Sequence, residues 1–325
     1  MLGDIAEVFA GLILLIWGAD RFVHGAAATA RNLGVAPLMI GLTIVSFATS
    51  APEILVSVVA AGQGKAGLAV GNAIGSNIAN IGLVLGTVAL FRPIELKSAT
   101  LRREMPALLA VSLLTVALFL DSYLARIDGF VLLTALVIVI IWLVRLGIRS
   151  SATDPLQTDF EAEIPTGTSM KWAITWLVVG IIALLFGAEF LVGGAINIAR
   201  TIGVSEMVIG ITLVALATSL PELAVSLVSA IKGEFGIAIG NIVGSNIFNL
   251  LAVIGVAAAI QPSAMPPSVL SLHLFVMVAF TLVLFAMTYE YDGRGVITRY
   301  EGFALVAAFL AYDTYVVLQN VRIGS

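Results

Sequence analysis

Long apolar segments recur along the whole chain, and they constrain the fold more than any other feature. Most of these runs reach the roughly 18 residues that a helix needs to cross about 30 Å of hydrocarbon. The chain is 60% hydrophobic and only 11% charged, whereas a soluble domain carries about 25% charged residues. We therefore expect an all-α polytopic protein of the lipid bilayer.

The apolar runs predict ten membrane-spanning helices. We place them at 4–23, 36–62, 67–90, 105–121, 127–147, 171–195, 205–231, 235–259, 269–289 and 298–318. The first run lacks the positively charged region that precedes a signal peptide core, so we expect it to remain as a membrane helix.

Lysine and arginine are divided unequally between the two sides of these spans. Twelve lie in loops on one side, at Arg21, Arg31, Arg92, Lys97, Arg102, Arg103, Arg145, Arg149, Lys171, Lys232, Arg294 and Arg299. Four lie on the other side, at Lys65, Arg126, Arg200 and Arg322. Because cytoplasmic loops carry the excess of positive charge, we expect both termini outside and the loop between spans 5 and 6 in the cytoplasm.

Charge and cysteine content exclude several classes of partner and site. The net charge of −4 and the lack of a basic block argue against a nucleic-acid partner. The sequence has no cysteine, which excludes a disulfide framework, a thiolate metal site and a cysteine nucleophile.

The chain repeats itself at a fixed offset. Residues 40–55 read IGLTIVSFATSAPEIL and residues 209–224 read IGITLVALATSLPELA, while AVGNAIGSNIAN at 69–80 matches AIGNIVGSNIFN at 238–249. The offset is 169 residues in both blocks, and random apolar helices would not agree at Thr, Ser, Pro, Glu and Asn. Internal repetition of this kind identifies two copies of one structural unit.

Each copy holds five predicted spans, and this odd number means that the second copy enters the membrane in the opposite orientation. Inverted repeats with a site at the bilayer midplane are a recurrent transporter plan. The expected organisation is a first repeat at 1–148 with its motif at 38–86, a cytoplasmic linker at 149–170, and a second repeat at 171–325 with its motif at 207–255.

Two glutamates, Glu53 and Glu222, lie well inside the predicted spans and are repeat partners. Ionisable residues inside a membrane are costly and mark functional sites by default. Pro52 cannot bond to the carbonyl four residues back, so we expect span 2 to break near Ala48–Ser50. Thr49 or Ser50 would cap the following half-helix, whose positive dipole end favours a carboxylate. The second half repeats the arrangement with Thr218, Ser219, Pro221 and Glu222.

Spans 3 and 8 carry matching polar stripes at helical spacing. The stripes are Asn72, Ser76 and Asn80 in the first half and Asn241, Ser245 and Asn249 in the second. GxxxG pairs lie on the same spans, at Gly71 and Gly75 and at Gly240 and Gly244, and such pairs let helices approach closely. All of the possible ligands at this centre are oxygens. Hard cations such as Ca²⁺ take six to eight oxygen ligands, so the set favours Ca²⁺ or several monovalent ions.

The two blocks GLTIVSFATSAPE…GNAIGSNIAN and GITLVALATSLPE…GNIVGSNIFN resemble the α-repeats of the cation/Ca²⁺ exchanger superfamily, in particular prokaryotic Na⁺/Ca²⁺ exchangers. The resemblance covers nearly the whole chain. It implies a secondary antiporter of the prokaryotic cytoplasmic membrane, with ten helices in two inverted halves and alternating access through sliding of spans 1 and 6. It also implies Ca²⁺ and Na⁺ as transported ions and no cofactor.

The resemblance implies a role for each motif residue. The Ca²⁺ carboxylates of the family fall on Glu53 and Glu222, with backbone oxygens from Thr49 and Thr218. Its Na⁺ ligands fall on Ser50, Ser76, Ser219 and Ser245, with backbone oxygens at Ser46 and Ala215, and its central pair falls on Asn80 and Asn249.

The chain departs from the family pattern at three of these motif positions. Some members carry Asp where this chain has Asn249. Because an amide holds neither a proton nor a negative charge, the change argues against proton coupling and against K⁺ dependence. Ala51 replaces a more usual Leu, and Ser46 replaces a small apolar residue; both changes bear on ion selectivity.

Other readings of the same residues are open. A Ca²⁺/H⁺ exchanger of the same fold would use the two glutamates as proton carriers, and a K⁺-assisted exchanger would share the site. The glutamates could instead be buried residues that pair with polar neighbours, and the Asn and Ser stripes could serve only as hydrogen-bonding contacts between helices. An intramembrane hydrolase would need a serine with a His or Lys base, paired Asp residues or HExxH inside a span, and the sequence has none of these there.

Overall fold

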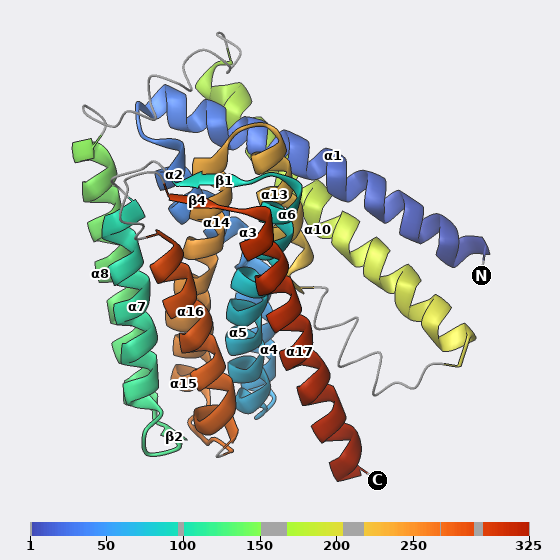
Figure 1. Ribbon diagram of the computed structural model, residues 1–325, viewed down its shortest axis with the longest axis vertical. Helices are drawn as coiled ribbons and strands as arrows, with labels where there is room; N and C mark the ends of the chain where they lie inside the picture. Colours follow the sequence, from blue (N-terminus) through green and yellow to red (C-terminus); the bar gives the residue numbers. More distant parts are fainter. Residues whose placement is uncertain are drawn as a thin grey trace.

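The computed structural model describes residues 2–96, 101–150, 168–203, 218–266, 268–288 and 295–324, and these segments are mainly helical. In chain order the α-helices and π-helices (η) are α1 (Leu2–Leu33), α2 (Pro37–Ile40), η1 (Gly41–Val45), α3 (Ser46–Thr49), α4 (Ala51–Gly62), α5 (Ala66–Ala79), η2 (Asn80–Leu85), α6 (Gly86–Phe91), α7 (Leu101–Leu118), α8 (Arg126–Ser150), α10 (Met170–Thr201), α13 (Leu220–Ile231), α14 (Phe235–Phe248), η4 (Asn249–Val253), α15 (Ile254–Ile260), η5 (Val269–Leu274), α16 (Phe275–Thr288) and α17 (Arg299–Gly324). Figure 1 shows an upright bundle with α1 and α10 crossing it diagonally.

The described helices agree with the membrane class. Seven of them are long and apolar enough to cross a membrane alone, and the bent pair Pro37–Thr49 and Ala51–Gly62 makes an eighth candidate. Glu104–Leu118 and Leu220–Ile231 are shorter apolar helices at the expected spans 4 and 7. The first half of span 7 and nearly all of the 149–170 linker lie outside the described residues.

Two helices are longer than the sequence predicted. We expected spans at 4–23 and 171–195, but α1 and α10 each contain 32 residues. At 1.5 Å per residue such a helix is about 48 Å long, which exceeds the hydrocarbon thickness of about 30 Å, so it must tilt or extend beyond the hydrocarbon. The expected spans covered only the apolar runs, whereas both helices continue past them, and Figure 1 shows both lying diagonally to the other helices.

α1 and α10 pack antiparallel along most of their length through a shared pattern of glycines, here called the glycine seam. Its glycines recur at every seventh residue, at Gly11, Gly18 and Gly25 on α1 and at Gly180, Gly187 and Gly194 on α10. A Cβ added at any of them would lie under 3.0 Å from a backbone atom of the other helix. The seam therefore holds the two backbones close together and makes α1 and α10 a single packed pair.

Two short antiparallel ladders connect the halves at opposite ends of the bundle. β1 (Ile94–Leu96) pairs with β4 (Gly295–Ile297), and β2 (Tyr123–Leu124) pairs with β3 (Ser263–Ala264). Figure 1 places β1 and β4 at the top and β2 at the bottom. Ile94 and Ser263 are 169 residues apart in the sequence, so equivalent strands of the two halves lie at opposite ends.

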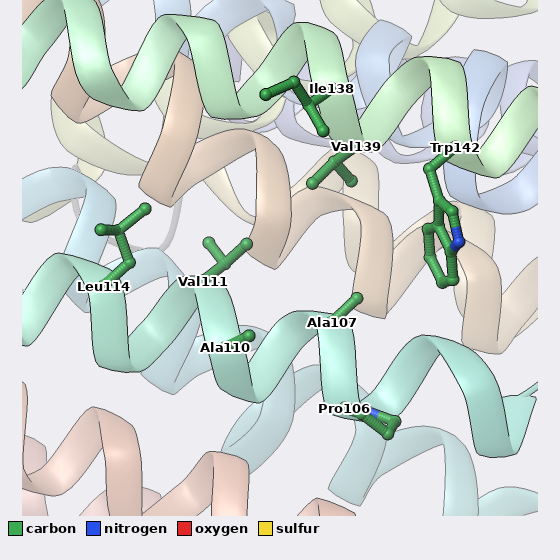
Figure 2. A pocket seen from close by; sticks show the side chains of 8 residues that line it. All are labelled: Pro106, Ala107, Ala110, Val111, Leu114, Ile138, Val139 and Trp142. Atoms are coloured by element: carbon green, nitrogen blue, oxygen red, sulfur yellow. The ribbon is translucent and has the colours of Figure 1, made fainter.

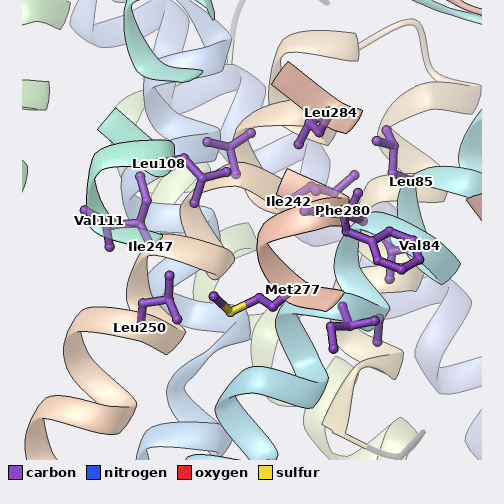
Figure 3. Packing of buried hydrophobic residues seen from close by; sticks show 14 of the residues in the cluster. Val84, Leu85, Leu108, Val111, Ile242, Ile247, Leu250, Met277, Phe280 and Leu284 are labelled. Atoms are coloured by element: carbon purple, nitrogen blue, oxygen red, sulfur yellow. The ribbon is translucent and has the colours of Figure 1, made fainter. Parts of the chain in front are cut away.

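The centre of the bundle is formed by the helices that carry the polar stripes. In the most apolar 18-residue stretch of each span, 89% of the residues are buried in Phe235–Ile260 and 72% in Ala66–Phe91, whereas the share is no more than 33% in the other unbroken candidate spans. Figure 3 shows apolar side chains of α7, η2, α14 and α16 packed together around this centre. The polar stripes therefore lie inside a shell of apolar helices and not at the lipid surface.

Candidate cation site

Glu53 and Glu222 occupy the same position in two half-helices. Each lies in the first turn of its helix, α4 or α13, behind a proline at the start. Each is only 1% exposed. α3 and α4 meet at a bend of 42°, so the predicted break before Glu53 is confirmed.

The caps of these half-helices differ from the expectation. Ser50 and Ser219 are the N-cap residues by position, but neither hydroxyl makes a capping hydrogen bond, and Thr49 bonds elsewhere. Both serine hydroxyls are buried without a hydrogen-bond partner among the described residues, so their oxygens are available to other partners.

The two carboxylates form a buried acidic centre. Glu222 interacts electrostatically with Glu53, and the side chains of Thr49 and Ser50 lie close to its carboxylate. Oε2 of each glutamate is buried without a hydrogen-bond partner. In the described part of the chain neither glutamate has a basic partner, so this centre holds two buried acids without a neutralising base.

Thr49 connects the first break to α14. Its hydroxyl donates to Oδ1 of Asn241 at 2.9 Å and lies 3.3 Å from the hydroxyl of Ser245. Asn241 in turn donates through Nδ2 to the hydroxyl of Ser226 at 3.0 Å and to the backbone oxygen of Glu222 at 3.3 Å. This chain of contacts joins α3, α14 and α13, and it fixes the two broken segments relative to each other.

The other stripe residues lie in the same interior. Ser76, Ser245, Asn80 and Asn249 are all 5% exposed or less. Asn80 and Asn249 are the first residues of η2 and η4. Single π-helical turns within α-helices are rare and are frequent at functional sites, so both halves have a helix irregularity at the central amide.

The remaining predicted ligands are Ser46, Thr218 and Ala215, and the structure describes the first two. Ser46 is fully buried, and its backbone oxygen accepts a hydrogen bond from the N–H of Ser50 at 2.9 Å and lies 3.3 Å from the Thr49 hydroxyl, whose proton is donated over the shorter distance to Asn241. Thr218 is partly buried, two residues before the start of α13. Ala215 lies outside the described residues.

The close packing expected of the GxxxG pairs is present in the second half. A Cβ at Gly240 would lie 2.6 Å from the backbone oxygen of Leu38, and one at Gly244 would meet the side chain of Ser46. A Cβ added at Gly71 or Gly75 would have no described atom within 4 Å. Their expected neighbour is the first half of span 7, which is outside the described segments.

Three polar residues of the centre were absent from the predicted site: Asn77, Asn246 and Ser226. Asn77 and Asn246 each follow a stripe serine by one residue, so they fall about 100° away from the stripe on a helix. A search for every polar repeat partner, and not only for those on one helix face, would have found them.

The structure also has a cavity of about 420 Å³ between α7 and α8 (Figure 2). Its lining runs from Pro106 to Leu114 on α7 and from Ile138 to Trp142 on α8. These side chains offer no oxygen ligand, so we do not assign a cation to this cavity.

A buried pair of carboxylates, each in the first turn of a helix inside an apolar bundle, defines a membrane protein with an acidic site in its interior. Comparison with known proteins gives the family. The sodium/calcium exchanger protein family model matches residues 5–148 and 172–318, and the chain belongs to this family.

The relatives and solved structures extend over nearly the whole chain. The putative antiporter CaxA of Alkalimonas amylolytica is 47% identical, with 94% of this chain and 96% of the relative covered. The sodium/calcium exchanger MaX1 of Methanosarcina acetivorans is 31% identical, with 93% and 95% covered. The solved sodium-calcium exchanger NCX_Mj, soaked with Na⁺ and Ca²⁺, is 34% identical and matches with a TM-score of 0.83, covering 96% of this chain and 97% of that one. These similarities place the protein among the transporters of this family.

Proposed function

We propose that this protein exchanges Ca²⁺ for Na⁺ across the membrane by alternating access. The observation that supports this proposal most directly is the pair Glu53 and Glu222. Both are buried in the first turn of equivalent helices, interact with each other and have no basic partner among the described residues. Two carboxylates neutralise one divalent ion or accept competing monovalent ions, and such competition suffices for exchange when only loaded sites switch sides.

The proposed ligand set follows the motif. Ca²⁺ binds the carboxylates of Glu53 and Glu222 and the backbone oxygens of Thr49 and Thr218. Na⁺ binds Ser50, Ser76, Ser219 and Ser245 and the backbone oxygens of Ser46 and Ala215, with Asn80 and Asn249 at the centre. Among the described residues no three His, Cys, Asp or Glu side chains gather in one place, so neutral oxygens must complete the six to eight ligands of Ca²⁺.

The proposed architecture is ten helices in two inverted repeats, at 1–148 and 171–325. The equivalent strands at opposite ends of the bundle support the inversion. The contacts between the halves support the inversion too. Gly86 of α6, in the first half, contacts α17 of the second half, and its repeat partner Gly255 of α15 contacts α8 of the first half. The glycine seam makes α1 and α10 a unit that can slide as one body. The charge bias favours termini outside the prokaryotic cytoplasmic membrane and the 149–170 linker inside.

The test is ⁴⁵Ca²⁺ entry into liposomes that contain the purified protein and Na⁺, after dilution into Na⁺-free buffer. The same vesicles receive a pH gradient in place of the Na⁺ gradient, and a third set receives K⁺ in addition to the Na⁺ gradient. Uptake that follows Na⁺ and ignores both pH and K⁺ supports the proposal. Uptake driven by pH alone assigns the protein to Ca²⁺/H⁺ exchange, and uptake that requires K⁺ assigns it to K⁺-assisted exchange.

A further inference from the structure

A second polar cluster lies at the contact between spans 3 and 8, and the proposed ligand set uses only one of its members. Asn77 and Asn80 come from the first half and Asn246 comes from α14 of the second. All three are 2% exposed or less. A buried amide is costly unless its hydrogen bonds are made, so the partners of each amide show what the cluster holds in place.

The bonds in this cluster fix one end of the Asn80 amide. Nδ2 of Asn80 donates to Oδ1 of Asn246 at 3.1 Å. Oδ1 of Asn80 is buried and accepts no hydrogen bond from the described residues. Because the donor and acceptor ends of an amide diverge from one planar carbon, the bond to Asn246 turns the oxygen of Asn80 away from α14.

Asn80 begins η2, and η2 packs against α13, the helix that carries Glu222. A cation needs the oxygen of an amide, since its NH₂ group is only a donor. Two negative carboxylates would attract the NH₂ end instead when no cation is bound. A group that retains the NH₂ end is therefore needed to keep the oxygen presented.

We propose that Asn246 is a positioning residue, which accepts the Nδ2 hydrogen bond of Asn80 and so holds the Asn80 oxygen toward the cation. This inference rests on the proposed function and adds a residue to its site. Asn246 need not touch the ion, because its action passes through the orientation of Asn80.

The repeat partner of Asn246 provides a matched control. Asn77 is the same residue type and is as deeply buried as Asn246. Its Nδ2, however, donates to the backbone oxygen of Asn246 at 3.2 Å and lies 3.8 Å from Sδ of Met277. In the described residues Asn77 makes no bond to a proposed ligand side chain. Removing its amide thus disturbs the packing without releasing Asn80.

The test is a double-mutant cycle on the Kd of Ca²⁺, measured by calorimetry on the purified full chain. The variants are Asn80→Ala, Asn246→Ala and the double variant, with Asn77→Ala alone and combined with Asn80→Ala. We expect Asn246→Ala to raise the Kd about three- to ten-fold, as for the loss of one hydrogen bond. When Asn80 is already replaced by Ala, adding Asn246→Ala should not change the Kd further. Asn77→Ala should change the Kd by the same factor in the parent protein and in the Asn80→Ala variant.

A conservative variant separates positioning from folding. Asn246→Asp keeps an acceptor for Nδ2 of Asn80, so its Kd should be no weaker than that of the parent. Additive effects of Asn246→Ala and Asn80→Ala, or a Kd for Asn246→Asp as weak as for Asn246→Ala, would overturn the inference while leaving the proposed function intact. A parent protein that neither binds nor transports Ca²⁺ would overturn the proposed function itself, and the inference with it.

Discussion

Lys232, at the end of α13, binds Asp20 in the middle of α1. Its Nζ lies 2.6 Å from Oδ1 of Asp20 and donates to the backbone oxygen of the same residue at 3.0 Å. The contact joins the pair formed by α1 and α10 to the rest of the bundle. If that pair slides during exchange, this ion pair must break in each cycle, so it favours the conformation seen here.

We predict that Lys232→Gln weakens this preference. The ion pair is about one-third exposed, and such pairs contribute at most about 1 kcal/mol, which corresponds to about a five-fold shift between the two conformations. The measurement is the ratio of apparent Ca²⁺ affinities from the two sides of oriented vesicles. Lys65→Gln, which removes a lysine from the corresponding loop of the first half, is the control and should leave the ratio unchanged. Equal effects of the two substitutions would contradict the prediction.

Glu53→Gln and Glu222→Gln are predicted to abolish Ca²⁺ uptake while leaving the protein folded. Each change keeps the side-chain volume and removes one of two buried, interacting charges. A bound ligand stabilises a protein by about 2.7 kcal/mol at one hundred times its Kd, so Ca²⁺ should raise the Tm of the parent but not that of either variant. Uptake at the parent rate by either variant would remove the glutamates from the site.

The glycine seam should be sensitive to a single methyl group. A Cβ at Gly187 would lie 2.6 Å from the backbone nitrogen of Leu15, whereas one at Gly193 meets no described atom within 4 Å. Gly187→Ala should therefore lower the free energy of unfolding by about 1–3 kcal/mol, as other overpacked sites do. Gly193→Ala, six residues further along α10, should leave the Tm unchanged or raise it, because Ala favours helix over Gly. Thermal unfolding in detergent compares the two variants, and a similar loss of Tm in both would show that the seam is not closely packed.

Asn249→Asp is predicted to make Ca²⁺ uptake depend on pH. Asn249 is 1% exposed at the start of η4, and an aspartate there adds a third acid to the centre. A carboxylate can take up a proton in place of the cation, whereas an amide cannot. Uptake by the variant should fall more steeply than that of the parent between about pH 8 and pH 6. Parallel pH profiles of the two proteins would show that residue 249 does not influence the site.

The sequence predicted those parts of the site that depend on local chemistry. Pro52 indicated the helix break, and the offset of 169 residues connected Glu53 with Glu222. Both predictions rest on backbone geometry within one helix or on direct comparison of the two halves, and neither requires knowledge of how distant segments pack.

The relations between helices could not be predicted in the same way. Thr49 was a candidate cap for α4, but its hydroxyl reaches Asn241, which is 192 residues away in the sequence. The length of α1 could not follow from its apolar run, because its packing on α10 continues past that run to Gly25. The hydrogen bond between Asn80 and Asn246 could not be predicted because it joins the two halves of the chain.

The glycine seam uses equivalent positions of the two repeats on its two helices. Gly11, Gly18 and Gly25 become Gly180, Gly187 and Gly194 on addition of 169, and each set contacts the backbone that carries the other. One half therefore carries on its first helix a surface complementary to a second copy of itself. A gene for a single half would already encode this contact as a symmetric homodimer, so duplication and fusion of that gene would require no new interface between α1 and α10.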